Sequence, residues 1–105
     1  MAKPKFSLTP SPTFKAKVDI PIPGGAPAQV EFVFKGRTRD QFESFMNDLS
    51  DKKPDDLVMD IASGWDLDEA FEQDNIDKLT QNYLGAGLAI WAKYVSELTK
   101  ARQGN

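Results

Sequence analysis

Two short segments of alternating apolar and polar residues, joined by a loop of proline and glycine, constrain the fold of this chain most strongly. Between residues 14 and 22, apolar side chains occupy every second position. The same period of two returns over residues 30–34. This period is typical of a strand that buries one face. The linking sequence PIPGGAP contains Gly24 and Gly25, which adopt turn conformations easily. We therefore predict an antiparallel β-hairpin.

The residues before the hairpin are predicted to form an extended arm. Residues 1–13 contain three prolines, which donate no backbone hydrogen bond and oppose helix formation. Phe6 and Leu8 alternate within this arm, where they could pack on the domain or reach a neighbouring molecule. Because 105 residues suit one small core, we assign residues 14–105 to a single domain.

Helical patterns dominate the rest of the chain. Thr38 is followed three residues later by Gln41, a capping box that predicts a helix over residues 39–50. Pro54 suits the first position of a second helix, which we expect Gly64 to stop.

A short helical turn is then expected over residues 66–73. Asp74 or Asn75 is predicted to cap a last helix that continues to about Arg102. The chain should therefore adopt an α+β fold, in which an N-terminal β-hairpin packs on a C-terminal group of three to four α-helices.

Two apolar stripes run along the last helix. One consists of Leu84, Leu88, Trp91, Val95 and Leu98, and the other of Tyr83, Gly87, Ile90, Tyr94 and Ala101. Together they are wider than the ~100° stripe that a surface helix usually buries. Either the hairpin covers one stripe and the preceding helices the other, or part of this surface binds a partner. The candidate contact residues are Trp91, Tyr94, Val95 and Leu98 on the helix, and Phe6 and Leu8 on the arm.

Two glycines interrupt the last helix near its middle. Gly85 and Gly87 either kink this helix or split it in two. We expect them to lie where another helix or another subunit approaches the backbone closely.

Charge is distributed unevenly along the chain. The net charge is −3, but residues 1–39 carry seven Lys/Arg and two Asp/Glu, whereas residues 40–77 carry two Lys and thirteen Asp/Glu. These regions could be solvated faces, or they could steer the basic end of one copy onto the acidic middle of another. The overall acidity argues against nucleic acid as a partner. No run of about 18 apolar residues is present, so no membrane partner is expected either.

The sequence contains no residue pattern typical of a catalytic, metal-binding or nucleotide-binding site. The chain contains no histidine and no cysteine, which removes the commonest catalytic and metal-binding side chains. The acidic middle lacks the glycine turn and the terminal glutamate of a calcium loop. Gly85-Ala86-Gly87 follows no strand, so it is not a dinucleotide-binding loop. We predict a protein that is not an enzyme and needs no cofactor or metal.

A longer pattern resembles one protein family. A Gly-Trp pair (Gly64, Trp65) precedes acidic residues and then a helix of the form NxxxLxxNYxGAxxAI. Its positions are Asn75, Leu79, Asn82, Tyr83, Gly85, Ala86, Ala89 and Ile90. This arrangement resembles the tail assembly chaperones of long-tailed (siphovirus, lambda-like) bacteriophages. The hairpin and the RTRDQF helix start also look like one branch of that family.

The resemblance implies a specific function, which the composition alone does not indicate. Such chaperones act in the cytoplasm of the infected host, where they coat the tape measure protein before the tail tube forms, and they are absent from the mature virion. Many have a longer form made by ribosomal frameshift, whose extension recruits tail tube protein. This chain would correspond to the short form. Separately, its uneven charge and the wide apolar surface of its last helix predict that copies associate head to tail into a ring or spiral.

Two other classes of function remain open at this point. The chain could be a structural virion protein, such as a tail completion or tube-associated subunit, which would be found in purified particles. It could also be a small acidic inhibitor, which would bind a basic DNA-binding protein tightly.

Overall fold

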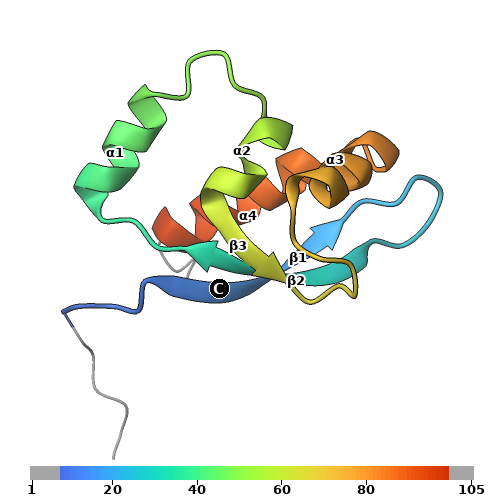
Figure 1. The fold of residues 1–105 in the computed structure, drawn as a ribbon, viewed down its shortest axis with the longest axis horizontal. Coiled ribbons are helices and arrows are strands. Elements are labelled where there is room, and N and C mark those ends of the chain that lie inside the picture. The colour runs from blue at the N-terminus through green and yellow to red at the C-terminus, as the bar shows by residue number, and fades with distance from the viewer. Residues whose placement is uncertain (1–7, 100–105) are drawn as a thin grey trace, which may run out of the picture.

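The computed structural model describes residues 8–99 and has the predicted α+β fold. The elements are β1 (Thr13–Ile20), β2 (Ala28–Lys35), α1 (Arg39–Asn47), α2 (Pro54–Ile61), β3 (Ala62–Trp65), α3 (Gln73–Asn82) and α4 (Ala86–Thr99). The strands form one antiparallel sheet in the order β1-β2-β3. Helices cover one face of this sheet, and α1 stands to one side (Figure 1). Among residues 8–99, no helix is long and apolar enough to cross a bilayer.

The predicted hairpin is formed by β1 and β2. Val18 lies opposite Val30, and Phe14 lies opposite Phe34. This register places the apolar residues of both strands on the face that meets the helices. Gly24 in the connecting loop has a φ of 79°, the left-handed conformation that glycine adopts without strain.

The third strand was not predicted. α2 ends at Ile61, and the chain enters β3 directly, so Gly64 lies in a strand and does not stop a helix. β3 pairs with β2, with Trp65 opposite Phe32. Beyond it, the backbone N–H of Asp66 donates to the Glu31 carbonyl at 3.0 Å. The edge of β2 that does not face β1 thus provides hydrogen-bond partners for the backbone of residues 62–66. This pairing with a distant segment outweighs the local sequence pattern that predicted a helix stop at Gly64.

The predicted last helix is split into α3 and α4. α3 ends at Asn82 and α4 begins at Ala86, which decides between the kink and the split. The residues from 66 to 72 form no helix, so the helical turn expected there is wrong. The cap prediction is also wrong, because Glu72 occupies the N-cap. The side chain of Asn75 instead donates to the carbonyl of Ala70 at 2.7 Å. The continuation toward Arg102 lies outside the described residues.

Close packing explains both glycines at this junction. A Cβ on Gly87 would lie 2.9 Å from the backbone nitrogen of Asp55, at the start of α2. A Cβ on Gly85 would lie 3.0 Å from Cγ of Pro21. The predicted approach of another helix is therefore confirmed for Gly87, whereas Gly85 is approached by the loop after β1 of the same chain.

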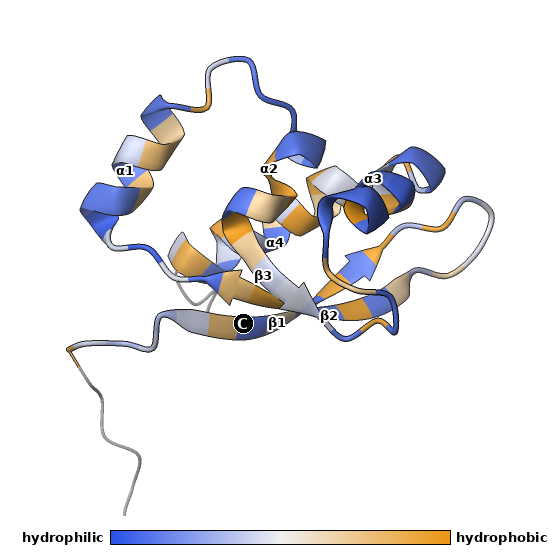
Figure 2. Ribbon diagram, in the orientation of Figure 1, coloured by the Kyte–Doolittle hydropathy of each residue, from blue (hydrophilic) through white to orange (hydrophobic). Residues whose placement is uncertain are grey.

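α1 is held differently from the other helices. Its capping box is confirmed, since the Gln41 N–H donates to Thr38 Oγ1 at 3.1 Å and the Thr38 N–H donates to Gln41 Oε1 at 2.8 Å. The helix ends at Asn47, three residues before the predicted end. None of its residues is buried. Figure 2 shows the hydrophobic residues concentrated in the sheet, α2 and α4, which supply most of the core.

Candidate interaction surface

The two apolar stripes of the last helix have different surroundings. Gly87, Ile90 and Tyr94 of one stripe are buried against the sheet and α2. The other stripe, here called the outer stripe, consists of Leu88, Trp91, Val95 and Leu98 on α4 together with Leu84 in the turn just before it. Leu84 is 82% exposed and Leu88 is 61% exposed, whereas the other three are half-buried. The domain therefore leaves one apolar stripe partly uncovered.

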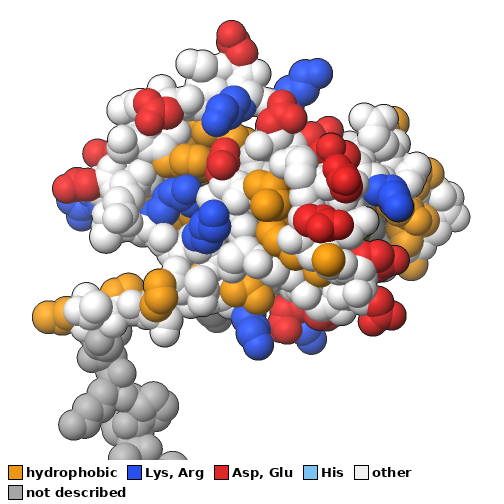
Figure 3. Space-filling model, viewed as in Figure 1, with side chains coloured by type: hydrophobic (Ala, Val, Ile, Leu, Met, Phe, Trp, Pro, Cys, Tyr) orange, Lys and Arg blue, Asp and Glu red, His pale blue; other side chains and the backbone are white. Residues whose placement is uncertain are grey.

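α1 lies beside the C-terminal half of the outer stripe. The ring of Phe45 contacts that of Trp91, with centroids 6.2 Å apart. Phe42 is half-buried and Met46 is exposed on the same helix. In Figure 3, hydrophobic side chains show in the hollow between α1 and α2. The apolar surface therefore extends from α4 onto α1.

Arg37 connects α1 to the rest of the domain. Its guanidinium donates to Tyr94 Oη at 2.7 Å and to the carbonyl of Asp60 at 2.9 Å. It also lies over the Phe45 ring, 4.0 Å from the centroid. Lys35 donates to the carbonyl of Met59 at 3.1 Å. Two cations from the end of β2 thus satisfy the last carbonyls of α2, where positive charge is favourable.

Tyr94 lies at the centre of this network. Its hydroxyl accepts from Arg37 and donates to the carbonyl of Lys35 at 2.8 Å. Burial raises the pKa of Tyr94, and the hydrogen bond and positive charge of Arg37 partly oppose that rise. The neutral phenol is therefore the form that the fold accommodates.

A groove lies at the C-terminal end of the outer stripe. One part of it, about 690 Å³, separates the arm from α1 and contains Phe14, Arg37 and Leu98 among its lining residues. An adjoining part, about 270 Å³, is lined by Arg39 and Phe42 and shares Arg37 and Leu98. The lining of the groove thus combines apolar side chains with two arginines.

The structure distributes the predicted contact residues over several environments. Trp91, Val95 and Leu98 lie together on the outer stripe. Tyr94 is fully buried, so it has no surface to offer a partner; its aromatic ring belongs to the core. Leu8 is 90% exposed on the arm. Phe6 lies outside the described residues.

The contact residues predicted from the sequence do not include three residues of this surface: Leu84, Leu88 and Arg37. Leu84 and Leu88 were recognised as part of a stripe, but their exposure depends on the break between α3 and α4. Arg37 carried no local signal, because its partners lie 23 and 57 residues away in the chain. Within residues 8–99, no group of three or more His, Cys, Asp or Glu side chains is arranged to hold a metal ion.

The chain as a whole is similar to a known protein family. The chain matches the family model of phage tail assembly chaperones over residues 1–105, its whole length. It therefore belongs to the phage tail assembly chaperone family, a class with a non-catalytic role. No curated protein and no solved structure matches the chain.

Proposed function

We propose that this chaperone coats the tape measure protein of its phage in many copies before the tail tube polymerises. The observation that carries this proposal is the outer stripe of α4, an apolar surface that the domain leaves partly exposed. Exposed apolar surfaces of this kind mark sites of protein interaction.

The shape of the outer stripe suits a helical partner. From Leu88 to Leu98 the helix rises about 15 Å, which is roughly three turns of a partner helix. The apolar side of α1 lies beside it, so a helix could rest between the two. A tape measure is expected to be a long helix with an apolar face, which would aggregate if left bare.

Coating also requires contacts between copies. Lys15 and Lys17 are exposed on β1, whereas Asp66, Asp68 and Glu69 are exposed after β3. Complementary charges at different places on one subunit favour head-to-tail assembly, which gives rings or open spirals. Weak contacts of each copy with the tape measure then combine through multivalency.

This role implies where the chaperone acts, when it leaves and which other proteins it works with. The chaperone would act in the host cytoplasm, leave before the virion matures, and cooperate with a longer frameshifted form that recruits the tail tube protein. Purified virions should therefore lack the chain.

Co-expression with the cognate tape measure protein tests the proposal. The chaperone should raise the soluble fraction of the tape measure and co-purify with it in several copies per tape measure chain. A tape measure that stays insoluble, with no chaperone bound, would contradict the proposal for this chain.

A further inference from the structure

We infer that the N-terminal segment of one copy docks, through Phe6, into an apolar pocket beside Trp65 and Tyr83 of the next copy. This inference deepens the proposed function, because it names the contact that would build the coat, and it rests on that proposal's self-association.

The pocket lies between the loop after β3 and α3. Its lining residues are Trp65, Leu67, Glu69, Asn75, Lys78, Leu79, Asn82 and Tyr83. Its volume is about 180 Å³. An apolar cavity of about 150 Å³ accepts one benzene molecule, so this pocket has room for a phenyl ring. Leu67 and Tyr83 are 38% and 37% exposed at the pocket, although both are large apolar residues.

The pocket is formed by a well-connected loop. The indole N–H of Trp65 donates to the carbonyl of Glu69 at 2.7 Å. The Trp65 ring meets Phe71 edge-on, with centroids 5.1 Å apart. Asn75 ties the end of this loop to α3 through its bond to Ala70. Because these contacts fix the pocket walls in advance, docking requires little ordering of the acceptor.

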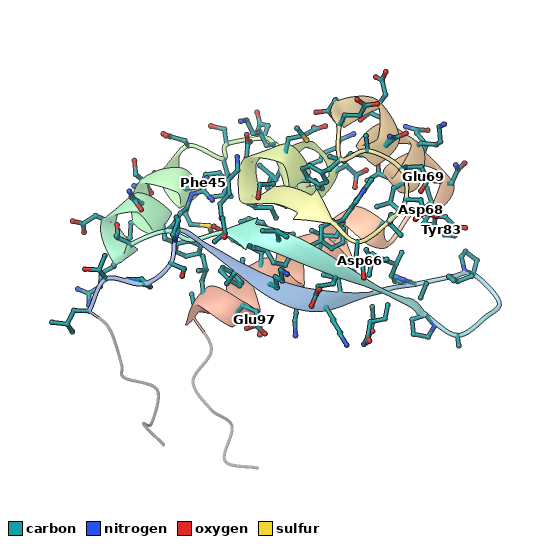
Figure 4. The ribbon with its side chains drawn as sticks, turned by 60° about the horizontal axis from the view of Figure 1, so that its bottom comes forward. Phe45, Asp66, Asp68, Glu69, Tyr83 and Glu97 are labelled. Carbon is teal, nitrogen blue, oxygen red and sulfur yellow. The ribbon has the colours of Figure 1, made fainter. Side chains whose placement is uncertain are left out.

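The surroundings of the pocket are acidic. Of the charged residues, Glu69 and Lys78 line the pocket itself, and the segment that contains them, residues 66–78, carries six carboxylates and this one lysine. Figure 4 shows Asp66, Asp68 and Glu69 on the same side of the molecule as Tyr83. The pocket therefore favours an apolar side chain that is flanked by positive charge.

The N-terminal segment has this chemistry. Lys3 and Lys5 precede Phe6, and no acidic residue occurs before Asp19. Pro4 restricts the backbone of the segment, which lowers the entropic cost of docking. The groove beside Leu98 suits this segment less well, because two arginines line it without a carboxylate, whereas Lys78 at the pocket is accompanied by Glu69.

The position of the arm favours docking between copies over docking within one copy. The arm leaves the domain at one end of the molecule, whereas Glu69 and Tyr83 lie at the other (Figures 1 and 4). Phe6 is only two residues beyond Leu8, a reach of about 7 Å. Each copy thus offers a segment at one end and a pocket at the other, which is the arrangement of a head-to-tail chain.

Cysteine cross-linking tests the contact directly, since the native chain contains no cysteine. Full-length Ser7→Cys protein is mixed with full-length Asn82→Cys protein under mild oxidation. The mixed disulfide dimer should exceed that of a Ser7→Cys and Ser44→Cys mixture by about tenfold, because docking raises the effective concentration of the two thiols. Ser44 is exposed on α1, away from the pocket.

A charge exchange gives a second readout that does not depend on introduced thiols. Lys5→Glu and Glu69→Lys should each weaken self-association in sedimentation velocity, and mixing the two variants should restore it. Phe6→Ala should raise the apparent dissociation constant by about tenfold or more, as expected for loss of an aromatic anchor.

Three results would overturn the inference: equal cross-linking in both mixtures, an unchanged dissociation constant in Phe6→Ala, or a chain that stays monomeric at millimolar concentration. The first two outcomes are distinct from failure of the coating function, whereas a strictly monomeric chain would also contradict the assembly that coating requires. If the native chaperone solubilises the tape measure but the cross-link is absent, only the docking contact is wrong.

Discussion

Gly87 determines how closely the start of α2 approaches α4. Its Cα faces the backbone and side chain of Asp55, where a methyl group has no room. Because the obstacle includes backbone atoms, a substitution must displace a whole helix and not only a flexible side chain. This packing accounts for a glycine inside an apolar helix, where alanine would otherwise be more favourable.

Gly87→Ala should lower the free energy of unfolding by about 2 kcal/mol or more, as expected for overpacking. Urea denaturation measures this change. The matched control is Gly25→Ala, whose new Cβ would lie 3.6 Å from Ile22 in ordinary contact. That variant should stay within about 0.5 kcal/mol of the native protein. Equal effects of the two substitutions would show that the approach of α2 is not tight.

Tyr94 should make the domain sensitive to alkaline pH. Burial raises its pKa above the ordinary value of 10.0, so the folded state holds the phenolic proton more tightly than the unfolded chain does. Its contribution to stability is complete below pH 10 and is lost as the pH rises through the folded pKa.

Tyr94→Phe should therefore cost about 1 kcal/mol at neutral pH, through the lost hydrogen bonds, yet lose stability less steeply above about pH 10. Urea denaturation at about pH 8 and pH 10.5 measures both effects. The rest of the chain is identical in the two proteins, so its contribution cancels in the comparison. Parallel stability curves would exclude a raised pKa for Tyr94.

At the scale of elements, α1 differs from the rest of the domain. It buries no residue, and its attachment depends on the Arg37 stack and the contact between Phe45 and Trp91. Elements with few buried contacts open with a low free-energy cost. In the proposed complex, α1 would therefore be the element that moves to admit a partner helix against the outer stripe.

Hydrogen exchange should reveal this difference. Backbone amides of α1 should exchange at least tenfold faster than those of β2 or α4, because α1 can open without unfolding the core. Arg37→Met should accelerate exchange in α1 further, whereas Arg39→Met, at an exposed position, should not. Uniform protection across α1, β2 and α4 would show that α1 belongs to the cooperative core.

The elements that could be predicted from the sequence are those defined by local signals. The hairpin follows from a period of two, and the start of α1 follows from the Thr38–Gln41 box. β3 could not be predicted in this way, because Ala62 and Trp65 become a strand only through pairing with β2. The surface was partly predictable: periodicity identified both stripes of α4. It could not decide which stripe is buried, so Tyr94 was named as a contact residue although its stripe faces the core.

At the scale of the whole molecule, the domain separates its apolar and charged features. The outer stripe and α1 form one surface, residues 8–13 of the arm lie at one end, and the pocket beside Tyr83 lies at the other (Figure 4). In the proposed coat, the first surface holds the tape measure while the two ends join neighbouring copies. The two kinds of contact can then be weakened separately by substitution.

The proposed role of the outer stripe of α4 in binding the tape measure can be tested by one co-purification experiment. Leu88→Asp places a charge on the exposed part of the stripe, and Ser96→Asp places the same charge on an exposed position of the same helix outside it. Each variant is co-expressed with the cognate tape measure protein, and the bound chaperone is quantified after circular dichroism has shown that both variants are folded. The account predicts that Leu88→Asp loses most of the bound chaperone while Ser96→Asp retains it. Equal retention by both variants would contradict the claim.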